Sequence, residues 1–194
     1  MHLRSSCFFL LLPFFNLAPA PNPLIAPGRS IGNITLGASP ETLTQLGPAA
    51  TSDAAMQKAW ATWYGKSASP GSPPTQLDVY TAATGSDMRK TIQMVRATSP
   101  WFHTAGGLHT GSTLASLRQA CGPFKLVTSY APTPKASLHY IYDNAKTGIA
   151  FELDGQTSNS HCTAIIVHLP GKSEPSTYLA MTQYLKLVKQ RASK

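Results

Sequence analysis

Two stretches of this chain carry the same order of turn and stop signals, and this repetition constrains the fold more than any other feature. Residues 32–39 (Gly-Asn-Ile-Thr-Leu-Gly-Ala-Ser) recur in pattern as residues 106–113 (Gly-Gly-Leu-His-Thr-Gly-Ser-Thr), so that Gly37 returns as Gly111. Each copy runs into a short helical pattern that ends in Gly-Pro. Ser or Thr suits a helix N-cap, and Gly-Pro ends a helix. The chain is therefore expected to use one small structural unit twice.

The second part of each copy predicts strands, because apolar residues alternate there and β-branched and aromatic types are frequent. Two of the segment pairs share one offset of 72 residues, as Val95 and Val167 do. The corresponding segments are 60–64 and 138–142, 77–80 and 149–152, and 91–96 and 163–168.

We therefore expect an α+β fold. It would be a tandem duplication of a helix plus a three- or four-stranded antiparallel sheet, with the first repeat at residues 28–103 and the second at 104–170. The segment 67–74 is rich in Pro, Ser and Gly and is predicted to be an exposed loop within the first repeat.

A C-terminal amphipathic helix is predicted over residues 174–191. Its apolar residues fall on one helical face, at Tyr178, Met181, Tyr184, Leu185 and Val188. We expect this face to pack on the body of the protein. The alternative is contact with a membrane or a partner, because Lys186 and Lys189 flank the stripe.

The N-terminal residues 1–20 are typical of a secretory signal peptide. Arg4 precedes an apolar run, and the small residues Ala18 and Ala20 follow it. The run is too short to span a bilayer. We expect a secreted or periplasmic protein of the cell envelope; because proline follows both alanines, the sequence leaves open whether the leader is cleaved or kept as an anchor.

Loss of the leader removes Cys7 and leaves Cys121 and Cys162. An even number of cysteines in an oxidising compartment predicts a disulfide between them. The alternative is two buried free thiols.

Basic side chains outnumber acidic ones by 16 to 8, which gives a formal net charge of +8. Such a surplus suits an acidic protein partner or an anionic membrane surface. Nucleic acid is disfavoured, because export separates the protein from most of it and the basic residues do not cluster with aromatic ones.

The order Gly-x-Ile-x-x-Gly-x-Ser, helix, Leu-Gly-Pro and strands, used twice over residues 30–168, resembles the β-lactamase inhibitor protein fold and the related small lipoprotein of the outer-membrane barrel-assembly machinery. The resemblance implies helices that cover one face of an antiparallel sheet and two units whose sheets form a concave binding surface. This chain differs because no lipidation cysteine follows its leader.

Catalytic and metal-binding patterns are weak in this sequence. His161 and Cys162 are adjacent, so on a strand they point to opposite faces and do not form a nucleophile–base pair. His139, His161 and His168 lack the spacing of a metal site. We predict no catalytic residues, metal or cofactor, and favour a protein that is not an enzyme.

The predicted function is recognition of a protein partner by the sheet surface of an exported protein. The residues assigned to that surface are Trp63, Tyr80, Arg96, His139 and His168. Aromatic residues exposed on a sheet are frequent hot spots of recognition, although the terminal helix or residues 101–102 could cover them instead. Alternatives are an envelope assembly or anchoring factor and a secreted hydrolase with an unrecognised site.

Overall fold

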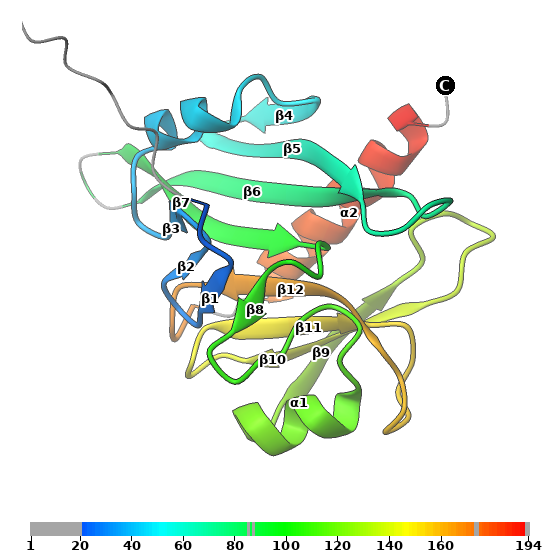
Figure 1. The fold of residues 1–194 in the computed structure, drawn as a ribbon. Coiled ribbons are helices and arrows are strands. Elements are labelled where there is room, and N and C mark those ends of the chain that lie inside the picture. The colour runs from blue at the N-terminus through cyan, green and yellow to red at the C-terminus, as the bar shows by residue number, and fades with distance from the viewer. Residues whose placement is uncertain (1–20, 85, 87, 173–174, 193–194) are drawn as a thin grey trace, which may run out of the picture.

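The dominant element is a single antiparallel sheet of eight strands, joined by a second sheet of four short strands (Figure 1). The computed structural model describes residues 21–84, 86, 88–172 and 175–192, so the predicted signal peptide lies outside the described residues. In spatial order the large sheet contains β4 (Thr51–Ala55), β5 (Lys58–Ser67), β6 (Pro74–Thr84), β7 (Arg89–Ala97), β12 (Cys162–His168), β11 (Ile149–Leu153), β10 (His139–Asn144) and β9 (Lys125–Tyr130).

The expected α+β architecture is wrong, because the fold is mainly β. The strands of the two predicted repeats form one continuous sheet. The helical pattern after Ser39 forms a 3-10 helix, η1 (Pro40–Leu46), and the one after Thr113 forms only the eight-residue helix α1 (Leu114–Cys121). Neither helix is long enough to serve as one layer of a separate helix-plus-sheet unit.

The two halves of the large sheet meet where β7 pairs with β12. Val95 lies opposite Val167 there, and these are residues that the offset of 72 makes equivalent. Strands β4 to β7 continue on one side of this joint and strands β12 to β9 on the other, in mirrored order. Each half thus forms a four-stranded meander, and the joint completes the sheet through backbone pairing between apolar strands.

One face of the large sheet is covered by the small sheet, η1 and α1 (Figure 1). The small sheet has the order β3 (Ile34–Thr35), β2 (Ser30–Ile31), β1 (Leu24–Ala26) and β8 (His103–Thr104). Thr113 caps α1 as predicted, because its Oγ1 accepts a hydrogen bond from the Ser116 amide at 3.3 Å. Ile25, Ile31, Leu114 and Leu117 are buried against Phe151 and Ile165 of the sheet.

The opposite face of the sheet packs against α2 (Pro175–Ala192), which crosses it diagonally in Figure 1. The five residues of the predicted apolar stripe are all buried there, which confirms that the helix packs on the body. Among the described helices, none combines the length and apolar character that a membrane span requires.

Candidate functional site

A groove runs between α2 and the first half of the large sheet. The groove has a volume of about 800 Å³. Trp60 and Tyr80 lie side by side on adjacent strands and stack with ring centroids 4.8 Å apart. Tyr184 of α2 also stacks with Trp60, with ring centroids 5.4 Å apart. The floor of the groove is therefore an aromatic stack fixed by both the sheet and the helix.

Charged side chains lie at the edges of this groove. Lys58 comes from the start of β5, Lys172 from the segment between β12 and α2, and Asp53 from β4. Met56 lies at the tip of the β4–β5 hairpin and is 91% exposed. The hairpin turn places Met56 and Gln57 at φ values of 45° and 65°, a conformation that non-glycine residues adopt rarely.

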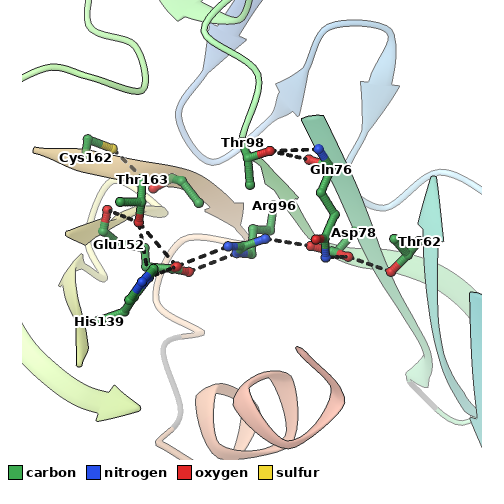
Figure 2. A network of polar contacts seen from close by, with 10 residues as sticks. Thr62, Gln76, Asp78, Arg96, Thr98, His139, Glu152, Cys162 and Thr163 are labelled. Atoms are coloured by element: carbon green, nitrogen blue, oxygen red, sulfur yellow. Dashed lines mark hydrogen bonds and ion pairs between the residues drawn. The ribbon is translucent and has the colours of Figure 1, made fainter. Parts of the chain in front are cut away.

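A second site lies on the other side of the buried stripe of α2, around a network of buried charges (Figure 2). Arg96 on β7 lies between two carboxylates: its Nη1 donates to Asp78 Oδ2 at 2.8 Å, and its Nε donates to Glu152 Oε2 at 2.9 Å. Thr62 and Gln76 donate to Asp78 Oδ1 at 2.6 and 2.8 Å. Because Asp78 and Arg96 belong to the first half of the sheet and Glu152 to the second, the network connects the halves.

The network keeps its charges despite burial. Burial alone would raise the pKa of Glu152, but the charge of Arg96 and the hydrogen bond from His139 outweigh it and lower the pKa to about 2. Burial alone would lower the pKa of Arg96, yet the anionic groups around it raise the pKa well above its ordinary value. Burial and the charge of Glu152 raise the pKa of Tyr130. An ion pair therefore persists here at neutral pH.

His139 is the network residue that solvent reaches, with a side chain 24% exposed. Its Nδ1 lies 2.6 Å from Glu152 Oε1 and 3.4 Å from Thr163 Oγ1. The residue lines a pocket of about 350 Å³ between the Pro-rich loop, β9, β10 and α2. We call this the proline-walled pocket, because its walls include Pro73, Pro74 and Pro132.

His168 belongs to a separate buried pair. Its Nε2 lies 2.9 Å from Asp143 Oδ1, and its Nδ1 lies 2.9 Å from the Leu169 carbonyl oxygen. The ring packs edge-on against Tyr178 of α2, with centroids 6.3 Å apart. Each of the three histidines considered for a metal site contacts a different acidic residue. His161 lies 3.8 Å from Asp154, and His139 contacts Glu152.

The five residues predicted to form one exposed surface are not brought together. Arg96 and His168 are 6% and 2% exposed, so their assignment to a contact surface is corrected: α2 covers the face on which they lie. Trp63 points to the opposite face, where its Nε1 donates to the Gly47 carbonyl at 3.0 Å. Tyr80 is half-buried in the groove, and His139 lines the proline-walled pocket.

Asp78 and Glu152 are the network residues that the sequence prediction missed. Each is a lone acidic residue within an otherwise apolar stretch of strand, in a chain of which only 12% is charged. Buried charges of this kind are rare unless they are paired. Together with Arg96, which follows the apolar pair Met94-Val95 in a third strand, this pattern was the available signal for a buried ion pair.

The cysteines expected to form a disulfide are free thiols here, with Cys162 buried and Cys121 half-buried. The Cys162 amide donates to the Ser112 carbonyl, just before α1, whereas Cys121 ends α1. At about 1.5 Å per residue, the helix separates them by roughly 12 Å, whereas a bridge needs Cα atoms within about 7 Å. Burial raises the pKa of both thiols.

Comparison with known proteins gives little support for a family. No protein-family model matches the chain, and no curated protein matches it. Among solved structures, the uncharacterized protein yfeY from Escherichia coli matches with 10% identity, over 56% of this chain and 80% of that one, at a TM-score of 0.31. A TM-score this low supports no argument. The β-rich fold is compatible with the resemblance described above, but no match identifies the family.

Proposed function

We propose that this chain is an exported, non-enzymatic binding protein that recognises an acidic segment of a protein partner in the groove beside α2. The observation that carries the proposal is the Trp60–Tyr80 stack, held at the floor of an open groove. Between this groove and the proline-walled pocket the helix covers the sheet, so the groove replaces the open sheet surface expected from the sequence.

The aromatic floor suits protein recognition because its side chains are already ordered. Trp60 stacks with both Tyr80 and Tyr184, so little side-chain entropy is lost when a partner binds. Tyrosine and tryptophan in such partly enclosed positions dominate the binding energy of many interfaces. Tyr80 is the more accessible of the two and would make the main contact.

The charge around the groove favours an acidic occupant. Lys58 and Lys172 outnumber Asp53 at its edges, and the whole chain has a formal net charge of +8. Cations at the rim of an interface attract an anionic partner and speed its association. Binding should therefore weaken as salt concentration rises.

The test compares Tyr80→Ala and the charge reversal Lys58→Glu/Lys172→Glu with the control Tyr64→Ala. Tyr64 is an exposed tyrosine on the same strand as Trp60, outside the groove. A photo-cross-linking residue at the exposed position Ala55 would trap the partner from a cell-envelope extract. We expect the cross-linked partner to be acidic. The yield of the cross-linked adduct should fall roughly tenfold or more in both groove variants and should be unchanged in the control.

Loss of the adduct in the Tyr64→Ala control, or its persistence in Tyr80→Ala, would contradict the proposal. N-terminal sequencing of the protein recovered from the envelope tests export separately. A mature terminus between residues 18 and 24 is expected if the leader is cleaved, and a full-length chain in the membrane fraction if the leader is retained as an anchor. Recovery from the cytoplasm would contradict export.

A further inference from the structure

The proline-walled pocket has the composition of a small-ligand site, separate from the proposed protein-binding groove. Its volume of about 350 Å³ falls at the lower end of the range of roughly 300–1,000 Å³ typical of ligand pockets, which suits a molecule with a single ring. Its walls are largely apolar and include Pro73, Pro74, Pro132 and Leu185. The buried network around Glu152 forms its polar floor.

The charged groups around the pocket already have partners. Both oxygens of the Glu152 carboxylate are engaged: Oε1 receives hydrogen bonds from His139 Nδ1 at 2.6 Å and from Arg96 Nη2 at 3.1 Å, and Oε2 receives one from Arg96 Nε at 2.9 Å. Lys189 also lines the pocket and is engaged in an interaction of its own. An ionic ligand would lose hydration here without gaining an unpaired countercharge from the described residues, so the pocket favours a neutral ligand.

His139 offers the hydrogen-bonding position that remains. Its Nδ1–H is donated to Glu152, so Nε2 of the neutral ring carries a lone pair and accepts a hydrogen bond. Nε2 lies on the side of the ring away from the carboxylate, and it has no hydrogen-bond partner among the residues that the structure describes. A ligand hydroxyl would donate to it. A protonated ring would instead donate from Nε2, and the oxygen of the same hydroxyl would accept, so a hydroxyl suits both forms of the ring.

We infer that the proline-walled pocket binds a small neutral phenol, its hydroxyl at His139 Nε2 and its ring against the prolines. A phenol keeps its proton up to about pH 10, so it enters the pocket uncharged. Aromatic rings and prolines pack together where Pro-rich peptides bind aromatic grooves, and here the roles of protein and ligand are exchanged. The proline rings are rigid, so this wall is formed before the ligand arrives.

Four probes with the same ring separate the head-group chemistry: p-cresol, toluene, p-toluate and p-methylbenzylammonium. Each is titrated into the protein at neutral pH, and binding is followed by the NMR shifts of backbone amides. We expect p-cresol to bind at least about fivefold more tightly than toluene, the gain from one hydrogen bond. Both ions should bind at least about tenfold more weakly than p-cresol, because their charges are left without a countercharge.

Toluene binding as tightly as p-cresol would remove the hydroxyl from the recognition. Tighter binding of either ion, or no binding of p-cresol at millimolar concentration, would overturn the inference as a whole.

Two variants locate the site. His139→Asn keeps an amide nitrogen near the position of Nδ1 for Glu152 but removes Nε2, so the advantage of p-cresol over toluene should disappear. Ala68→Trp fills the pocket from an exposed loop position and should abolish binding of both probes. Tyr80→Ala in the groove is the control and should bind p-cresol unchanged, which separates failure of this inference from failure of the proposed function.

Cooperative unfolding of each variant establishes that it is folded. A retained advantage of p-cresol in folded His139→Asn, or binding to folded Ala68→Trp, would contradict the assignment. Loss of p-cresol binding in folded Tyr80→Ala would place the ligand in the groove instead.

Discussion

The Arg96 network and the His168 pair occupy related positions in the two halves of the sheet, yet they differ in which strands they connect. Residues 96 and 168 are 72 positions apart, as are the equivalent strands, and both lie under α2. Arg96 contacts carboxylates from both halves, whereas His168 contacts Asp143 within the second half alone. Arg96 thus links the two halves of the sheet, whereas His168 links β12 to β10, two strands of the second half that are separated by β11.

The two clusters also differ in access to solvent. The Arg96 network ends at His139, which opens to the proline-walled pocket, whereas His168 is closed beneath Tyr178. A buried ion pair costs desolvation energy and by itself adds little stability, but removing one partner leaves an uncompensated charge. We therefore expect the network to be more sensitive to substitution than the pair.

The largest effect is expected for Arg96→Met, which leaves Asp78 and Glu152 buried without their cation. Loss of one partner from a buried ion pair costs about 3–5 kcal/mol. Chemical denaturation measures the change in the free energy of unfolding, and Lys186→Met on the exposed side of α2 is the control, expected within about 0.5 kcal/mol. A loss below 1 kcal/mol for Arg96→Met would mean that the network does not hold the halves together.

The next effect is a loss of stability in acid that depends on Glu152. Its pKa is about 2 in the folded protein against an ordinary value of 4.5, so the stabilisation is complete above pH 4.5 and is lost as the pH falls toward 2. Linkage gives about 3 kcal/mol for this shift. Unfolding measured from pH 6 to pH 2 should show a smaller acid loss for Glu152→Gln than for the natural protein. Parallel curves for the two proteins would refute this assignment.

A smaller effect is expected for Asp143→Leu, which leaves His168 Nε2 without its acceptor. An unsatisfied buried hydrogen-bonding group costs about 1–3 kcal/mol. The same denaturation experiment ranks this variant below Arg96→Met. The reverse order would show that the closed pair, and not the network across the joint, is the more important cluster.

The smallest effect concerns the two thiols: Cys121 ends α1, and Cys162 lies on β12 beside the residues that precede α1. Because they are unbridged, adding a reductant should change the free energy of unfolding by less than about 0.5 kcal/mol. Thiol titration without reductant should find both groups after unfolding, with Cys162 unreactive in the folded protein because its burial raises its pKa. A stability loss of 2 kcal/mol or more on reduction, the size typical of a bridge, would disprove the free-thiol state.

Local signals in the sequence predicted local structure well. The six predicted strand segments overlap β5, β6, β7, β10, β11 and β12, and the stripe of α2 is buried as expected. The outer strands β4 and β9 and the small sheet were missed, because short strands with exposed or mixed residues lack a clear alternation. Arg96 and His139 were assigned with Trp63 and Tyr80 to one recognition surface, but the structure places these residues in separate surroundings.

The sequence by itself determined where six strands of the large sheet and the terminal helix lie, because apolar periodicity, glycine turns and Gly-Pro stops act over a few residues. Only the tertiary structure decided that β7 pairs with β12 to make one sheet, and that α2 closes most of one face. A period of two shows which residues share a face but not what covers that face. For the same reason, the sequence pattern indicated that Arg96 and His168 are surface residues, whereas in the structure α2 and three acidic partners on other strands enclose them.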